Sequence, residues 1–333
     1  MISLDGSQGG GQLLRTALSL SAATGQAFEI KNIRGQRAKG GLQPQHLAAV
    51  HAVQQLCGAQ VEGDRRGSTS LRFEPGTIKG GKYTFDIGTA GSTTLLLQTL
   101  IPACLREEKE SIFIVKGGTD TLWCPPSHYF LHVFCRFLHA MGLTVHADIK
   151  RYGFYPKGGG EVSFTMDAHQ QLGDIHFVER GALQTIDVCA LVSKDLMQRQ
   201  VGERMLKGFQ TVFPDKMVRY DVHPVDTLSP GCVLHSHAHY EHFAVGADVL
   251  GEQKKKAEDV GKECALQLQR VMKSEGVDAY AADQLMIYLG LKGEGTIATD
   301  KITDHMTTNA QIIEQFLPVR FSMKKNVIMC RKV

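Results

Sequence analysis

The chain repeats one order of turn, helix, strand, loop, helix and strand three times, and this repetition constrains its fold more than any other feature. The first two copies lie about 85 residues apart, judged from Gln12 and Gln98. A third copy lies near the C-terminus, where a helix opens at Ala281. Because one such unit cannot bury its apolar helix faces alone, we predict that the three copies pack into one body.

Residues 182–275 interrupt this repetition. Their patterns predict a strand, a helix, two further strands and a second helix. A segment of this kind forms a small α/β unit of its own. We therefore predict an α/β (α+β) fold in which a large domain of three repeated units, residues 1–181 and 276–333, carries a smaller inserted α/β domain, residues 182–275.

Composition narrows the possible classes of protein. The 333 residues are 43% hydrophobic, enough to fill an ordinary core, and the net charge of +3 is too small to indicate nucleic acid by itself. The eight cysteines form no C-x-x-C pair, which argues against a zinc cluster or redox motif and for buried thiols in a reducing compartment. With no targeting pattern after Met1 and no membrane-length apolar run, we expect a cytoplasmic protein without a membrane partner.

Two loops near the N-terminus are candidates for holding phosphate. The glycine-rich turn from Asp5 to Gln12 precedes a helix, where backbone N–H groups can face an anion. It lacks the Walker spacing, and a simple tight turn is the alternative. The loop after the next strand places Arg34, Arg37 and Lys39 within six residues, among glycines. Arginine suits bidentate phosphate contacts, and a solvated surface loop is the alternative there.

A histidine-rich stretch lies within the predicted insert. On a strand, His235, His237, His239 and Glu241 share one face, and these are donors that zinc accepts. Same-face neighbours on one strand are roughly 7 Å apart, however, which is too far for three of them to meet one ion easily. We therefore expect a surface strand, with a metal site as the alternative.

One histidine near the C-terminus is a candidate nucleophile. A polar segment, residues 302–309, precedes apolar residues that recur at helical spacing from Ala310. With Thr308 or Asn309 as the helix cap, His305 would lie in the loop just before the helix. Backbone N–H groups there favour anions, and a neutral imidazole is a good nucleophile near pH 7. Since the chain has 14 histidines, this pattern needs support from the rest of the sequence.

Several stretches together resemble the RNA 3'-terminal phosphate cyclase family. The matching motifs are DGS at 5–7 with GGGQLLR at 9–15, IR at 33–34 with RAK at 37–39 and QHL at 45–47, GTAGS at 88–92 with Gln98, GGTD at 117–120, PP at 125–126, GFYPKGGG at 153–160, Tyr280 with DQ at 283–284, DH at 304–305 and FLPVRF at 316–321. Each motif is weak alone. Their order across nearly the whole chain outside the insert makes the set specific.

The resemblance implies a fold and a reaction. Members of that family have a large domain of three repeated α/β units with a smaller inserted domain, in agreement with the repeat and the insert. They use ATP to convert an RNA 3'-phosphate into a 2',3'-cyclic phosphodiester. By resemblance, His305 would attack the ATP α-phosphate and form a covalent histidine–AMP, from which AMP passes to the RNA 3'-phosphate. The neighbouring 2'-hydroxyl then closes the ring as AMP leaves.

The same resemblance assigns the other site residues. Positions matching the nucleotide contacts of the family are Gln98, Pro126, Tyr280, Ala281, Ala282, Asp283 and Gln284. Positions matching its phosphate and RNA contacts are Gln12, Arg15, Arg34, Arg37, Lys39, Gln45 and His46. ATP, a divalent metal (Mg²⁺ or Mn²⁺) and an RNA with a 3'-phosphate end are the implied ligands. Because aromatic residues make up only 7% of the chain, we expect phosphate and ribose contacts to hold the RNA, with little base preference.

The sequence departs from the family pattern at two places. The glycine-rich turn is two residues shorter than usual and lacks the Glu expected to hold the metal, so the metal ligands are unknown. Asp5 or Asp86 could replace it. Tyr152 stands where a basic residue normally precedes Gly153, and Arg151 is the nearest substitute.

Two other functions compete with the cyclase. A non-catalytic relative that binds RNA or a ribosome-assembly complex would lack the nucleophilic histidine, so His305 argues against it, while the missing Glu argues for it. An enolpyruvyl transferase also repeats α/β units and holds phosphates with Arg and Lys, but gives His305 no covalent role.

Overall fold

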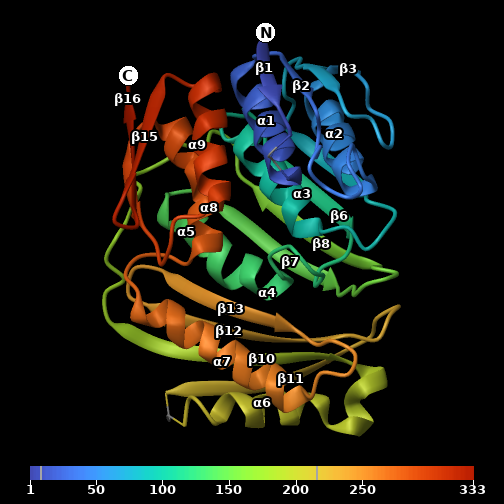
Figure 1. Ribbon diagram of the computed structural model, residues 1–333, viewed down its shortest axis with the longest axis vertical. Coiled ribbons are helices and arrows are strands. Elements are labelled where there is room, and N and C mark those ends of the chain that lie inside the picture. The colour runs from blue at the N-terminus through green and yellow to red at the C-terminus, as the bar shows by residue number, and fades with distance from the viewer. Residues whose placement is uncertain (8–9, 215–216) are drawn as a thin grey trace.

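The computed structural model describes residues 1–7, 10–214 and 217–333. Within these residues, helices cover four four-stranded mixed sheets, which confirms the predicted α/β class (Figure 1). Three of the sheets lie with their helices in one large body, and the fourth lies below it in Figure 1. No described helix is long and apolar enough to cross a membrane.

The first sheet shows the pattern that the others repeat. Its elements are β1 (Ile2–Asp5), α1 (Gly11–Thr24), β2 (Phe28–Lys31), α2 (Pro44–Cys57), β3 (Gln60–Glu62) and β4 (Leu71–Glu74). The strand order is β1-β2-β4-β3, with β1 parallel to β2 and the other pairs antiparallel. Helix α1 buries Leu13, Leu14 and Leu18, and it ends at Gly25, whose left-handed φ of 72° suits a residue without a side chain.

The second sheet has the same topology. Its elements are β5 (Gly81–Asp86), α3 (Thr93–Leu100) with a following 3-10 turn (Ile101–Cys104), β6 (Ser111–Gly117), a helical segment made of α4 (Ser127–Tyr129), a π-helical stretch (Phe130–Phe134) and α5 (Cys135–Ala140), β7 (Val145–Arg151) and β8 (Gly160–Met166). The strand order β5-β6-β8-β7 again joins the first two strands in parallel and the others antiparallel. The spacing of Gln12 and Gln98 therefore reflects a real repeat, although these residues take different positions in α1 and α3.

The third sheet repeats the pattern with an interruption. Its elements are β9 (His176–Phe177), α8 (Ala279–Lys292), β14 (Gly295–Ala298), α9 (Asp304–Phe316), β15 (Val319–Lys324) and β16 (Val327–Lys332). Strand β9 pairs with β14 in parallel, and β16 joins β14 to β15 antiparallel, as in the other two sheets. After β9 the chain leaves the third repeat, forms the inserted elements, and returns to the third repeat at α8.

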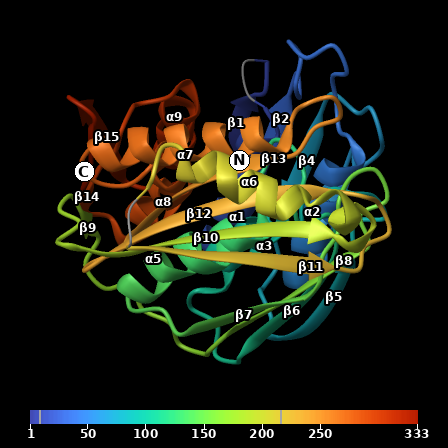
Figure 2. The ribbon, with the colours of Figure 1, turned by 90° about the horizontal axis from the view of Figure 1, so that it is seen from below.

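The fourth sheet is built from the inserted elements. They are β10 (Leu183–Ser193), a 3-10 segment (Lys194–Arg199), α6 (Val201–Gln210), β11 (Val218–Val225), β12 (Cys232–Tyr240), β13 (Ala244–Leu250) and α7 (Ala257–Lys273). Helices α6 and α7 cover one face of the sheet β11-β10-β12-β13 (Figure 2). The α4–α5 segment of the second repeat packs on strands β12 and β13. The rings of Phe137 and Phe243, 5.4 Å apart, are part of this contact.

The structure corrects three local predictions. Helix α9 begins at Asp304 with Thr303 as its cap, because the Thr303 hydroxyl accepts the Met306 N–H at 3.3 Å, so His305 lies in the first turn and not in a preceding loop. The second of the two further strands predicted in the insert, placed at residues 232–244, ends at Tyr240 as β12. After a turn, β13 follows from Ala244 to Leu250 as a separate strand that the sequence pattern did not predict.

The histidine-rich stretch is also placed differently. The expectation of a surface strand is wrong, since His235, His237 and His239 are 0%, 2% and 7% exposed. They point from β12 toward the α4–α5 segment, whose His128 and His132 rings they face. Glu241 lies beyond the end of β12 and is exposed.

Candidate functional site

The candidate site lies where the corresponding helices of the three repeats meet. One pocket is lined from α1, α3, α8 and α9, and a second, adjoining pocket shares Gln12 and Asn309 with it and is bordered by His305. The residues of the first are Gln12, Arg15, Thr16, Ser19, Gln98, Thr99, Asp283, Gln284, Ile287 and Asn309. All three repeats contribute helices to this pocket, and the third contributes both α8 and α9. Residues about 270 apart in sequence therefore come together here, Gln12 and Asp283 among them.

A buried carboxylate organises this junction. Asp283 of α8 accepts hydrogen bonds from the side chains of Gln12 and Asn309, the latter at 2.8 Å. Asn309 in turn accepts the Thr16 hydroxyl at 2.8 Å. The network fixes the starts of α1, α8 and α9 against one another. Burial raises the pKa of Asp283, and the bond from Gln12 and the nearby His305 and Arg15 oppose that rise.

Two basic side chains of the first repeat face this junction. Burial lowers the pKa of Arg15 to about 10, although Asp283 and Cys124 favour its charged form. Burial, with the positive charges of Arg15 and Arg34, also lowers the pKa of His46 to about 3, so His46 is neutral near pH 7. Gly11 allows this packing, because a Cβ there would collide with the His46 ring. A strongly basic group thus stands beside a neutral imidazole, a combination suited to an anion.

His305 is accessible to a ligand. It is exposed in the first turn of α9, beside Gly10, Gln12 and Asn309 in the second pocket. The first turn of a helix carries unpaired backbone N–H groups and the positive end of the helix dipole, both of which favour a phosphate there. The position predicted as a loop is therefore a helix terminus with the same chemical consequence.

Gln98 is buried with its amide group unpaired among the described residues. Its side chain is only 7% exposed, yet neither its Nε2 nor its Oε1 has a hydrogen-bond partner within the described ranges. Buried polar atoms are normally paired, since leaving one unpaired costs about 1–3 kcal/mol. Gln98 lines the first pocket, where a bound polar ligand would supply the missing partners.

The other predicted nucleotide contacts lie near the start of α8 and α4. Tyr280 is 72% exposed, and its ring lies 6.5 Å from that of Tyr129. Gln284 borders the first pocket, whereas the side chains of Ala281 and Ala282 are fully buried in α8 and do not line it. Pro126 is the half-buried residue before α4 and is not among the pocket residues.

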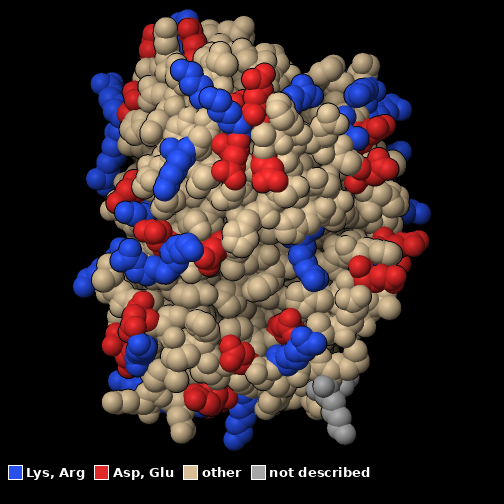
Figure 3. Space-filling model, turned by 180° about the vertical axis from the view of Figure 1, so that it is seen from behind, with Lys and Arg blue, Asp and Glu red and all other residues tan. Residues whose placement is uncertain are grey.

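The basic loop divides into one structural arginine and two exposed cations. Arg34 donates to the carbonyl oxygens of Lys39 at 2.6 Å and Gly41 at 3.2 Å, which closes the loop on itself. Arg37 and Lys39 remain exposed, and Arg37 lies near Gly10, where the second pocket begins. Gln45 lies at the start of α2, next to Gly91 of the second repeat. On the face seen in Figure 3, positive and negative side chains are interspersed.

The carboxylates proposed to replace the missing Glu are engaged locally. Asp5 accepts from the Ser7 backbone and hydroxyl and from Asn32, and Asp86 accepts the Gly88 N–H. The residues Gln8 and Gly9 of the shortened turn lie outside the described residues. Among the described residues, the one group of three or more His, Cys, Asp or Glu side chains with donor atoms close together is in the inserted sheet.

Two residues of the network were not anticipated from sequence. Thr16 and Asn309 sit on helix faces that look ordinary in the sequence, and Asn309 was considered only as a helix cap. Only the packing of α1 against α9 shows that they hold Asp283 in place.

Comparisons with known proteins show which family the chain belongs to. The family model described as RNA 3'-terminal phosphate cyclase matches residues 7–323. Proteins named RNA 3'-terminal phosphate cyclase from Ralstonia nicotianae and Pyrobaculum neutrophilum are 41% and 37% identical, each over 97% of this chain and 93% and 95% of their own length. A solved EPSP synthase from Acinetobacter baumannii covers 98% of this chain and 64% of its own at 11% identity, with a TM-score of 0.35 that is too low to support an argument. The chain therefore belongs to the RNA 3'-terminal phosphate cyclase family.

Proposed function

We propose that this protein converts an RNA 3'-terminal phosphate into a 2',3'-cyclic phosphodiester at the expense of ATP, through a covalent AMP on His305. The observation that carries the proposal is the exposed His305 at the start of α9, beside pockets that contain a buried cation, Arg15, and an unpaired amide, Gln98. The family membership supports the overall reaction. The residue roles below are argued from the geometry.

In the first step His305 attacks the α-phosphate of ATP. A bond forms between the imidazole nitrogen and phosphorus, the bond to the bridging oxygen breaks, and pyrophosphate leaves. Backbone N–H groups at the start of α9 and the Arg15 guanidinium stabilise the charge that builds on the phosphate oxygens. Phosphoryl transfer depends mostly on positioning and charge neutralisation, so a rigid junction held by Asp283 suits it.

The amide of Gln98 suits a nucleotide because it lines the first pocket and its donor and acceptor atoms have no partner among the described residues. Tyr280, with an exposed ring, offers a stacking surface for a base near the start of α8. Arg37, near Gly10 of the second pocket, and the exposed Lys39 of the same loop can bind RNA phosphates. These contacts place both substrates against His305.

In the second step the RNA 3'-phosphate attacks the phosphorus of the histidine–AMP, and the bond to the imidazole breaks. The 2'-hydroxyl of the same ribose then attacks the activated 3'-phosphate, loses its proton and expels AMP. Because the hydroxyl and the phosphate share one ribose, their orientation needs little further ordering. A divalent metal bound with the ATP phosphates would neutralise part of their charge, and its protein ligands are unassigned.

The test is covalent labelling with ATP carrying a radioactive α-phosphate and a divalent metal, without RNA. We expect acid-labile, alkali-stable label on the unaltered protein and none on His305→Ala. His51→Ala is the matched control, because His51 is exposed and contacts only Asp64 among the hydrogen-bond and ion-pair partners described. It should keep full labelling.

Absence of label on the unaltered, folded protein with either metal would contradict the proposal. Retained binding of RNA ends in that case would favour a non-catalytic RNA-binding role. Label that persists on His305→Ala would place the nucleophile elsewhere.

A further inference from the structure

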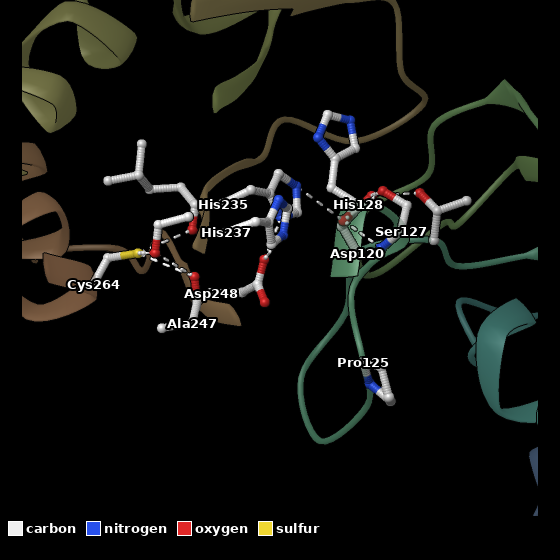
Figure 4. Close-up of polar contacts among 12 residues, drawn as sticks. Asp120, Pro125, Ser127, His128, His235, His237, Ala247, Asp248 and Cys264 are labelled. Carbon is white, nitrogen blue, oxygen red and sulfur yellow. Dashed lines mark hydrogen bonds and ion pairs between the residues drawn. The ribbon is translucent and has the colours of Figure 1, made fainter. Parts of the chain in front are cut away.

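A second cluster of chemically active groups lies in the inserted sheet, apart from the residues of the pockets. His235 and His237 of β12 and Asp248 of β13 point to the same side of the sheet, with His235 directly opposite Asp248 in the strand register (Figure 4). One donor atom from each of the three residues lies within 4.8 Å of the others. The sequence suggested that one strand could not gather such donors. The neighbouring strand β13 supplies the third donor, the carboxylate of Asp248, directly opposite His235.

The geometry places Asp248 between the two imidazoles. Its Oδ1 lies 2.5 Å from Nδ1 of His235 and 3.7 Å from Nε2 of His237. The three side chains are 0%, 3% and 6% exposed. Opposite His237 stands Gly246, which leaves room for the ring, since a Cβ there would lie 3.0 Å from it.

Two ring nitrogens at this place lack hydrogen bonds. Nε2 of His235 and Nε2 of His237 are both buried without a hydrogen-bond partner in the described part of the chain. Such atoms cost free energy unless a ligand satisfies them. Nε2 of His237 faces the buried carboxylate of Asp248, and a metal ion between these two groups would bind both.

The surroundings also suit a metal. Nε2 of His235 lies 3.6 Å from Oδ1 of Asp120, which Ser127 and Thr119 hold through hydrogen bonds of 2.7–2.9 Å. When Nδ1 of a histidine binds a metal, the other nitrogen usually donates its N–H to a carboxylate of this kind. The His128 ring stacks on His235 with centroids 4.3 Å apart and fixes its orientation (Figure 4).

We propose that the inserted sheet binds one divalent transition-metal ion of the zinc type through Nδ1 of His235, Nε2 of His237 and the carboxylate of Asp248. The ion replaces the proton between His235 and Asp248, and that proton passes to solvent. Donors around tetrahedral zinc are about 3.3 Å apart, so small side-chain shifts complete the site, with a water in the fourth position. Asp120 and His128 belong to the second repeat, so the ion fastens the inserted sheet to the large body.

The test is metal binding by the whole chain after chelation and dialysis. Titration with Zn²⁺ against a coloured chelator should show one tight equivalent, and thermal unfolding should move to higher temperature as Zn²⁺ is added, because the ion binds the folded state. His237→Ala and Asp248→Asn should each weaken binding by at least tenfold, in line with loss of a ligand. His146→Ala, an exposed histidine on β7, should bind as the unaltered protein does.

Co²⁺ gives a readout that needs no variant and so survives a folding failure. We expect the intense visible absorption of a four-coordinate site, removed by one equivalent of Zn²⁺. Weak absorption typical of hydrated, octahedral Co²⁺, no tight equivalent of Zn²⁺, or equal loss of binding in His146→Ala would overturn the proposal. Zn²⁺ binding that is unchanged in both ligand variants would overturn it as well.

Discussion

At the scale of single residues, the site is marked by side chains whose bonding is incomplete. Gln98 is buried with both amide atoms unpaired, whereas Gln26 donates to the Phe316 carbonyl at 2.7 Å. The first arrangement costs stability and is expected where a ligand completes it. The second is an ordinary structural bond. The same contrast separates Arg34, which braces its own loop, from the exposed Arg37.

This contrast gives a prediction about Gln98→Leu. Removing an unpaired amide should leave the free energy of unfolding unchanged or raise it by about 1 kcal/mol, because no hydrogen bond is lost. The rise in unfolding temperature produced by ATP should fall by at least half. Calorimetry with and without ATP measures both effects.

Gln26→Leu is the matched control. It leaves the Phe316 carbonyl without its partner, so it should destabilise the protein by about 1 kcal/mol and keep the full response to ATP. If Gln98→Leu were the more destabilising of the two and still responded fully to ATP, the role given to Gln98 would be wrong.

At the scale of elements, helix starts position the chemistry. Thr303 begins α9 and so places His305 in its first turn. Asp278 is the N-cap of α8, and its Oδ1 accepts the backbone N–H groups of Tyr280 and Ala281. The same oxygen also accepts the Tyr129 hydroxyl at 2.6 Å. Burial raises the pKa of Asp278 to about 6, although those bonds oppose the rise, and its Oδ2 has no partner in the described residues. The cap that holds Tyr280 in place is therefore under electrostatic strain.

Asp278→Asn should relieve that strain. A carboxyl whose folded pKa is raised contributes most stability below its ordinary pKa of 3.8 and loses it as pH rises through about 6. Asparagine keeps the capping oxygen without the charge, so the variant should be more stable than the unaltered protein at pH 7 by about 2–3 kcal/mol. The difference should shrink toward pH 4.

Urea unfolding across this range measures the effect. Asp259→Asn, at an exposed position in the first turn of α7, should change stability by only a few tenths of a kcal/mol at either pH. An Asp278→Asn difference that does not depend on pH would refute the argument.

At the scale of the whole molecule, both crossings between the large body and the inserted sheet meet at one arginine. Arg180 follows β9 and is 7% exposed. Its guanidinium donates to the Gly276 carbonyl and, at 3.0 Å, to that of Val271, where α7 returns to the large body. It also lies 5.3 Å from the Tyr240 ring centroid. One side chain thus joins the segment that leaves the large body after β9 to the segment that returns to it at the end of α7.

Arg180→Met should loosen this joint. The methionine fills part of the space but leaves several buried carbonyl groups unpaired, so we expect a loss of about 3 kcal/mol. Calorimetry should then resolve two unfolding transitions, one for the inserted sheet, in place of one. Arg199→Met, at an exposed position after β10, is the control and should keep the original profile. A single unshifted transition in Arg180→Met would contradict the prediction.

Most helices and strands follow from local patterns, because apolar spacing and residues such as Gly25 and Gly58 act on neighbours in the chain. The boundary errors have local causes too. The sequence analysis placed the cap of this helix at Thr308 or Asn309. The N-cap of α9 is instead Thr303, whose hydroxyl accepts the Met306 N–H. Asn309 instead faces Asp283, a contact set by the packing of α8 and α9 that no spacing in the sequence encodes.

The sequence by itself determined the threefold repetition, the insert and the candidate nucleophile, because these rest on periodicity and on ordered motifs. Only the tertiary structure decided that Gln12, Gln98 and Asp283 share one junction and that Asp248 completes a donor set with His235 and His237. The physical reason is that these contacts join helices from different repeats or facing strands of one sheet. Their partners are fixed by packing and strand register, whereas local patterns report only on a residue's own helix or strand.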